Sequence, residues 1–307
     1  MMPDLTVTIG QLVLKNPVMP ASGCFGYGEE YAAFYDLSQL GAIVVKGTTV
    51  EPRLGNAPVR IAETAAGILN AIGLQNPGVV AAKDRIRQLA RYGTPVIVNV
   101  AGNSSSDYQR VIEILEDEPT VAAYEINISC PNVKQGGLAF GTDPEVVAEL
   151  INKLRSATHR TLIVKLSPNV TDIVAVAQAA ESAGADALSL INTLVGMAID
   201  AEKRRPVLAN LTGGLSGPAV KPVALRMVWQ VTEAVQIPVI GMGGISCAED
   251  AVEFLLAGAS AVAIGTANFV NPTVCPEVIA GLSEYLKRHQ LRSVQELIGL
   301  AKAAGKN

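Results

Sequence analysis

Histidine is scarce in this chain, with only His159 and His289 among 307 residues. Neither lies at the end of an apolar segment that could form a buried strand. Histidine is the side chain that enzymes most often use to move protons near neutral pH. A catalytic site built on this sequence therefore needs another group for that step.

Cysteine is scarce as well, and its spacing argues against several kinds of site. Cys24, Cys130, Cys247 and Cys275 are far apart, and no two form a Cys-x-x-Cys pair. We therefore expect no zinc, iron–sulfur or other metal site on this chain alone. A disulfide framework is equally atypical of a large cytoplasmic chain.

Positive charge, aromatic residues and long apolar runs are also in short supply. The net charge of −4 argues against a nucleic-acid binder that works through a basic surface. No apolar run is long enough to span a membrane, and Met1-Met2-Pro3-Asp4 lacks the basic and apolar regions of a signal peptide. We expect a cytoplasmic protein. A composition with 49% hydrophobic and 4% aromatic residues fits a soluble α/β enzyme.

Short apolar, β-branched segments recur along the chain, with helical patterns between most of them. The eight segments are Pro17–Ala21, Ala42–Thr48, Pro95–Ala101, Ala123–Ser129, Leu162–Ser167, Ala187–Asn192, Pro238–Gly243 and Ala261–Thr266. Eight strands that alternate with helices over about 250 residues predict an α/β fold, a (β/α)₈ or TIM barrel. We expect a single domain over residues 1–307 with a C-terminal helical tail.

An open doubly wound sheet is the alternative architecture. It usually carries a Gly-x-Gly-x-x-Gly turn after its first strand. The first strand here leads instead into Ala21-Ser22-Gly23-Cys24-Phe25-Gly26, which does not fit that turn.

Several helix boundaries follow from capping residues. Asp143-Pro144 begins one helix, and Thr171 or Asp172 begins another. Ser246-Cys247-Ala248-Glu249 has the spacing of a capping box. The helical tail is predicted over Glu277–His289 and Ser293–Ala304.

The segment from Glu125 to Asn132 reads as a buried strand that runs into a thiol and is stopped by Pro131. Polar groups buried in an apolar element are costly unless they have partners or a task. With no histidine nearby, Cys130 is the leading candidate for the group that moves a proton or attacks a substrate.

Two lysines lie inside apolar strands, Lys46 in Val44-Val45-Lys46-Gly47 and Lys165 in Ile163-Val164-Lys165-Leu166. Each could extend from the strand end to solvent, but lysine is rarely buried without a partner. In a barrel, chemistry lies at the C-terminal ends of the strands. The expected partner is an anion or an electron-rich ring bound there.

The last two strands end in glycine turns, Gly241-Met242-Gly243-Gly244 and Gly265-Thr266-Ala267-Asn268. Barrel phosphate sites commonly use the loops after these strands, where backbone N–H groups act as donors. The turns indicate a phosphorylated cofactor or substrate, although they could serve only to reverse the chain. Two long loops, Pro131–Asp143 and Leu194–Pro218, are expected to be lids, partner contacts or surface excursions.

Taken together, these residues resemble the class 1 dihydroorotate dehydrogenases, which bind FMN in a (β/α)₈ barrel. The resemblance covers nearly the whole chain, and its carriers are Pro20-Ala21-Ser22-Gly23, Val45-Lys46-Gly47-Thr48, residues 70–76, residues 127–132, Asn192-Thr193, residues 241–245 and Gly265-Thr266. Residues 70–76 and Val133-Lys134-Gln135-Gly136-Gly137 look most like the NAD-linked subtype, 1B. That subtype has a partner subunit with FAD and a [2Fe-2S] cluster, and the resemblance implies a homodimeric core in a heterotetramer.

The resemblance also implies a role for each matching residue. Cys130 would be the general base that removes the C5 proton of dihydroorotate, with the hydride from C6 passing to FMN and orotate as the product for pyrimidine (UMP) synthesis. FMN would be contacted by Ser22, Lys46, Gly47, Asn99, Asn127, Lys165, Ile191, Gly217, Gly243, Gly244, Gly265 and Thr266. Substrate would be held by Lys46, Asn70, Ala71, Ile72, Gly73, Leu74, Asn127, Asn192 and Thr193.

Three alternatives remain open at this point. The first is the fumarate-linked subtype, 1A, a homodimer without a second subunit. The second is another flavin barrel that reduces a different pyrimidine or tRNA. The third, from a different class, is a non-catalytic barrel that binds a phosphorylated ligand.

Overall fold

The computed structural model describes residues 2–128 and 141–304 of the chain. Cys130 and most of the expected loop Pro131–Asp143 therefore lie outside the described residues. No helix in the described part of the chain is both long enough and apolar enough to cross a membrane.

The predicted eight-stranded parallel barrel is confirmed. Its strands, in chain order, are β3 (Val18–Pro20), β4 (Ile43–Thr48), β7 (Val96–Val100), β8 (Val121–Asn127), β9 (Thr161–Lys165), β10 (Ala187–Leu190), β15 (Val239–Met242) and β16 (Ala261–Ile264). From β4 to β16 each strand pairs in parallel with the next, and β16 pairs with β3. Between β3 and β4 the Gly41 N–H donates to the Val18 carbonyl at 2.9 Å. Because neighbours follow chain order all the way round, there is no switch point of the kind an open doubly wound sheet needs.

The strands form where the sequence is aliphatic and β-branched, and they are covered on both faces. All five residues of β7 and all five of β9 are buried. Such strands read as continuous apolar runs because one side packs in the barrel and the other against helices. A polar residue in one of these strands is therefore unusual. The polar residues near the C-terminal strand ends are the candidates for the functional site.

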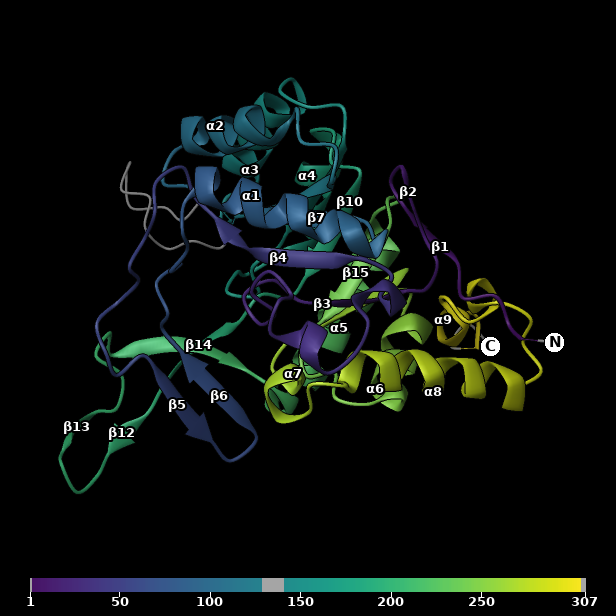
Figure 1. Ribbon diagram of the computed structural model, residues 1–307. Helices are drawn as coiled ribbons and strands as arrows, with labels where there is room; N and C mark the ends of the chain where they lie inside the picture. The colour runs from purple at the N-terminus through teal and green to yellow at the C-terminus, as the bar shows by residue number, and fades with distance from the viewer. Residues whose placement is uncertain (1, 129–140, 305–307) are drawn as a thin grey trace.

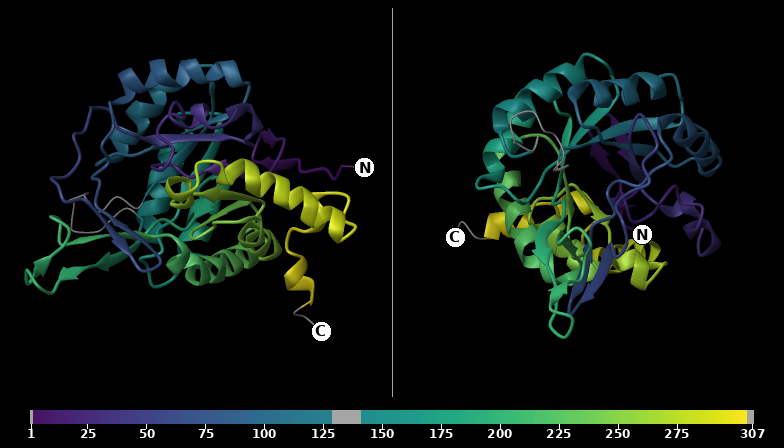
Figure 2. Two further views of the ribbon diagram at one scale, coloured as in Figure 1. Left: turned by 60° about the horizontal axis from the view of Figure 1, so that its bottom comes forward. Right: turned by 90° about the vertical axis from the view of Figure 1, so that its left-hand side faces the viewer.

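Helices surround the strands in a ring (Figure 2, right). They are α1 (Val79–Gln88), α2 (Ser105–Leu115), α3 (Pro144–Arg155), α4 (Ile173–Ser182), α5 (Lys221–Ala234), α6 (Ala248–Leu256), α7 (Ala267–Val270), α8 (Val274–Arg288) and α9 (Leu300–Ala304). The predicted caps Asp143 and Asp172 are confirmed, because each side chain accepts a hydrogen bond from the first turn of its helix.

Two details of the helix prediction are wrong. The side chain of Ser246 bonds to the Asp250 carboxylate at 2.8 Å instead of forming a capping box with Glu249, and Cys247 occupies the N-cap position without a side-chain cap bond. Lys221 holds that carboxylate in place from α5, at 2.6 Å. The segment Ser293–Ala304 is not one helix either, since Gly299 at φ +74° separates a short 3₁₀ turn from α9.

The expected loop Leu194–Pro218 is also more regular than predicted, because most of it forms strands. A four-stranded antiparallel sheet joins β5 (Ile61–Thr64), β6 (Gly67–Asn70), β11 (Leu194–Met197) and β14 (Thr212–Ser216) in the order β11-β14-β6-β5. A small ribbon of β12 (Ile199–Asp200) and β13 (Arg205–Pro206) extends from it. This sheet projects from the end of the barrel opposite the two termini (Figure 1). Two segments that are far apart in the sequence thus share one sheet, which the residue pattern of either segment alone did not reveal.

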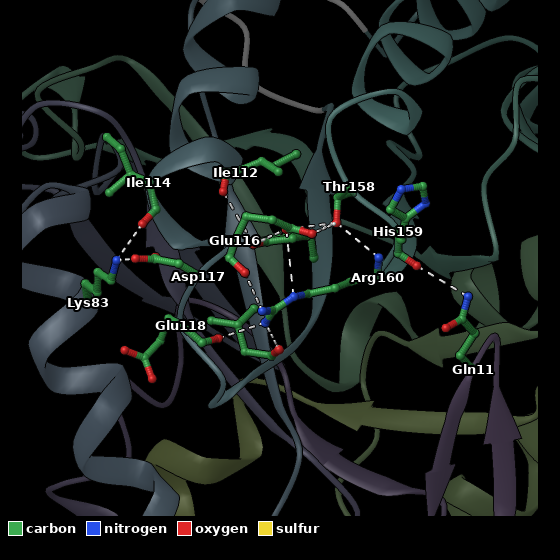
Figure 3. Close-up of polar contacts among 12 residues, drawn as sticks. Gln11, Lys83, Ile112, Ile114, Glu116, Asp117, Glu118, Thr158, His159 and Arg160 are labelled. Carbon is green, nitrogen blue, oxygen red and sulfur yellow. Dashed lines mark hydrogen bonds and ion pairs between the residues drawn. The ribbon is translucent and has the colours of Figure 1, made fainter.

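Polar groups at the N-terminal end of the barrel are paired with one another (Figure 3). Arg160, just before β9, donates to the carbonyls of Glu116 at 2.6 Å and Glu118 at 2.9 Å. The Thr158 hydroxyl donates to the Glu116 carboxylate at 2.9 Å. The hairpin of β1 (Val7–Ile9) and β2 (Leu12–Leu14) covers this end, with the Gln11 side chain donating to the His159 carbonyl. His159 therefore lies at the N-terminal end of the barrel, away from the cavity at the C-terminal strand ends.

Candidate active site

A cavity of about 1220 Å³ opens at the C-terminal ends of the barrel strands. It is bounded by strand ends and by the antiparallel sheet. All the predicted ligand-contacting residues line it: Ser22, Lys46, Gly47, Asn70, Ala71, Ile72, Gly73, Leu74, Asn99, Asn127, Lys165, Ile191, Asn192, Thr193, Gly217, Gly243, Gly244, Gly265 and Thr266. Their individual roles stay predictions. Cys130 lies outside the described residues, but Ile128, two positions earlier, lines the cavity.

The two lysines reach the cavity in different ways. Lys165, the last residue of β9, is only 5% exposed, so it does not extend to solvent. Its Nζ donates to the Ser22 hydroxyl at 3.2 Å and lies 3.9 Å from the Glu125 carboxylate. Lys46 on β4 is half-buried, and burial lowers its pKa. The cavity therefore has one firmly held cation and a second that loses its proton more readily than an exposed lysine.

Glu125 on β8 lies behind the cavity lining, and the sequence alone suggested no role for it. It is 3% exposed, and its carboxylate accepts hydrogen bonds from Asn99 Nδ2 at 2.6 Å and Ser189 Oγ at 2.8 Å. The sequence feature that could have identified it is an acidic residue inside an otherwise apolar strand. The period of two places it on the same face of the strand as Asn127, which lines the cavity.

Amide side chains gather along the wall next to the antiparallel sheet. Asn192 donates to Asn127 Oδ1 at 3.4 Å, and Asn70 donates to the Gly214 carbonyl at 3.3 Å. A Cβ at Gly214 would lie 2.1 Å from Thr193 Oγ1, so only glycine allows β14 to approach so closely. Amides offer both donors and acceptors, which suits a small ring bearing its own amide groups.

The glycine turns line the part of the cavity formed by the ends of β15 and β16. Gly243 has φ +124° and Gly244 has φ +79°, a backbone region that favours glycine. A Cβ on Gly244 would lie 2.8 Å from the backbone nitrogen of Lys221. Across the cavity wall the Thr266 hydroxyl donates to Ser216 at 2.8 Å. Backbone N–H groups in such turns can donate to a phosphate bound in the cavity.

Cys24 also lines the cavity and is thus a rival thiol to Cys130. Burial raises the pKa of Cys24 to about 11, although the charges of Lys165 and Lys46 act in the opposite direction. At neutral pH a thiol of that pKa is almost wholly protonated and cannot accept a proton. Burial raises the pKa of Cys275 to about 12. Cys247 is exposed at the N-cap of α6 and does not itself line the cavity.

This architecture defines a class of protein, a (β/α)₈-barrel enzyme whose site at the strand ends suits a phosphorylated ring cofactor beside a small polar substrate. The family model described as dihydroorotate dehydrogenase matches residues 4–286. The chain belongs to the dihydroorotate dehydrogenase family.

Similar proteins cover almost the whole chain. The proteins named dihydroorotate dehydrogenase B (NAD(+)), catalytic subunit, from Geotalea daltonii and Bacteroides fragilis are 56% and 58% identical over 98% and 97% of this chain and 99% of their own lengths. A crystal structure of DHODH from Eimeria tenella, in complex with ferulenol, is similar with a TM-score of 0.82 at 26% identity, covering 96% of this chain and 88% of the other.

The raised pKa of Cys24 makes a prediction for thiol labelling. Below pH 9, iodoacetamide should modify Cys24 roughly a hundredfold more slowly than a free thiol, because only the thiolate reacts. The rate should rise about tenfold per pH unit up to the pKa. Site-resolved mass spectrometry measures this, with exposed Cys247 as the internal control. A Cys24 rate that levels off below pH 10 would contradict the assignment.

Proposed function

We propose that the chain is the catalytic subunit of an NAD⁺-linked dihydroorotate dehydrogenase, which oxidises (S)-dihydroorotate to orotate. The observation that carries the proposal is the single cavity in which two lysines, an amide wall and two glycine turns meet at the strand ends. Membership of the dihydroorotate dehydrogenase family and the names of its relatives support the same reaction.

The residues present fit FMN as the cofactor. The buried acceptor Asn99 Oδ1 has no hydrogen-bond partner among the described residues, and so suits a ring N–H. The glycine turns at Gly243-Gly244 and Gly265 bring backbone to the cavity lining, where N–H groups can donate to a phosphate. FMN would be held by Ser22, Lys46, Gly47, Asn99, Asn127, Lys165, Ile191, Gly217, Gly243, Gly244, Gly265 and Thr266. When bound, FMN supplies the acceptor for a hydride.

The chain's own residues would carry out the rest of the reaction. The Cys130 thiolate takes the proton from C5 of dihydroorotate while C6 gives up its hydride, so that the substrate loses two hydrogens and a C5–C6 double bond forms. Lys165, on the cavity lining, would stabilise negative charge on a reduced flavin bound there. Lys46 faces the substrate carboxylate, and the amide wall orients the substrate through Asn70, Ala71, Ile72, Gly73, Leu74, Asn127, Asn192 and Thr193.

A second subunit completes the proposed enzyme. The relatives are named catalytic subunits, which fits a separate chain that takes the electrons onward. We assign FAD and a [2Fe-2S] cluster to that partner, with NAD⁺ as the final acceptor and a homodimer of this chain at the core of a heterotetramer.

Replacing Cys130 tests the base directly. Cys130→Ala should keep its flavin but be reduced by dihydroorotate at least about a hundredfold more slowly, because the proton at C5 has no acceptor. Cys24→Ala is the matched control, a second cavity-region thiol whose removal should leave the rate within about twofold. Stopped-flow absorbance of the flavin band gives both rates. Equal rates for Cys130→Ala and wild type would refute the base.

The pH profile provides a second test of the same residue. A free thiol has a pKa near 8.5, so the flavin-reduction rate should rise as pH increases through mildly alkaline values. A flat profile there would argue against a cysteine base.

The choice of electron acceptor separates the two class 1 subtypes. The chain alone, once reduced, should be reoxidised slowly by both NAD⁺ and fumarate. Adding a subunit with FAD and [2Fe-2S] should make NAD⁺ efficient. Rapid reoxidation by fumarate without a partner would identify the fumarate-linked subtype instead.

A further inference from the structure

A buried carboxylate that the proposed reaction does not use lies directly behind the cavity. Glu125 is 3% exposed and does not itself line the cavity. Three side chains surround it, and each comes from a different strand: Asn99 from β7 and Lys165 from β9, which both pair with β8, and Ser189 from β10, one strand further round the barrel. Two of the three, Asn99 and Lys165, reach the cavity.

Each of these three side chains presents a donor or a cation to Glu125. Asn99 Nδ2 lies 2.6 Å from Oε2, Ser189 Oγ lies 2.8 Å from Oε1, and Lys165 Nζ lies 3.9 Å from Oε2. An ionised carboxylate only accepts hydrogen bonds, so this surrounding fits the charged form of Glu125. The carboxylate thereby anchors groups on both neighbouring strands.

The orientation of the Asn99 amide follows from that anchor. An amide turned the other way would place its oxygen against the carboxylate, acceptor facing acceptor. With the nitrogen held by Glu125, Oδ1 must point away from it. Asn99 is 1% exposed, and its Oδ1 has no hydrogen-bond partner among the described residues. A buried acceptor of this kind is costly until a ligand brings a donor.

The glycine at position 47 leaves room beside that acceptor. A Cβ at position 47 would lie 3.0 Å from Asn99 Oδ1 and crowd it. Lys165, held by the same carboxylate and by Ser22, places a cation on the cavity lining beside this acceptor. The cavity lining thus presents the Asn99 oxygen as an acceptor and the Lys165 ammonium as a cation. Glu125, behind the lining, fixes the positions of both.

We propose that Glu125 is a positioning residue for the flavin, holding the Lys165 ammonium at the cavity and turning the Asn99 amide so that its oxygen faces the ring. This rests on the proposed function, since it takes the ring to be a flavin. An oxidised flavin ring has a single N–H and gains negative charge on reduction, which matches an acceptor beside a cation.

Single substitutions should disrupt this arrangement in the full-length protein. Glu125→Gln removes the charge, and Asn99→Asp sets two carboxylates against each other. Each should weaken FMN binding to the apoprotein by about tenfold or more, the ratio that corresponds to 1.4 kcal/mol. Each should also change the reduction potential of the bound flavin, measured with a chemical reductant and without dihydroorotate.

The exchange variant is the decisive one. In the double variant Asn99→Asp with Glu125→Gln, the amide introduced at position 125 can donate to the carboxylate introduced at position 99, so a donor again faces an acceptor. The pair keeps a single negative charge, now on residue 99, and residue 99 still presents an oxygen toward the ring. FMN affinity should return to within about fivefold of wild type, and the potential should move back toward it. Losses that add in the double variant would overturn the inference, as would a double variant that does not fold.

Glu118→Gln is the matched control. Glu118 is also buried, at 2% exposure, and pairs with Arg87 at the opposite end of the barrel. Glu118→Gln should lower thermal stability. It should leave FMN affinity within about twofold of wild type and should not shift the reduction potential of the flavin. An equal effect from both glutamates would mean that Glu125 is merely structural. Wild-type protein that binds FMN but is not reduced by dihydroorotate would refute the proposed function alone.

Discussion

The site depends on a charge pair buried at the end of an otherwise apolar barrel. Lys165 and Glu125 lie on adjacent strands, 3.9 Å apart and each about 95% shielded from solvent. Burying either charge alone would be strongly unfavourable, and a pair is tolerated only when further hydrogen bonds satisfy it. Ser22, Asn99 and Ser189 supply those bonds, so the pair fixes the positions of its neighbours on β7 and β10 and in the loop after β3.

Polar groups are paired at one end of the barrel and partly unpaired at the other, and this difference indicates which end binds a ligand. At the N-terminal end, Arg160, Glu116 and Thr158 bond one another and nearby carbonyls (Figure 3). At the C-terminal end, Asn99 Oδ1 is left without a partner among the described residues, and glycine turns leave backbone accessible. A barrel that satisfies its polar groups at one end and leaves them available at the other is organised to bind a ligand there.

Local chemistry in the sequence was enough to predict the barrel and the polar residues at its strand ends, whereas residues such as Asn70 and Gly217 were predicted only from the family resemblance. Continuous apolar runs mark strands covered on both faces, and residues at their ends, such as Lys46 and Asn127, converge because parallel strands share an edge. The sheet of β5, β6, β11 and β14 was missed because its pairing joins distant segments. Glu125 was given no role because its importance comes from cross-strand partners, and the helix start at Ser246 was misassigned because Lys221, on another helix, draws Asp250 into place.

The most direct test of the account is an anaerobic titration of the purified protein with dihydroorotate, followed through the absorbance of its flavin. The flavin band is expected to bleach as dihydroorotate is added, with one orotate formed for each flavin reduced. A protein that carries flavin but keeps its absorbance in excess dihydroorotate would contradict the central claim.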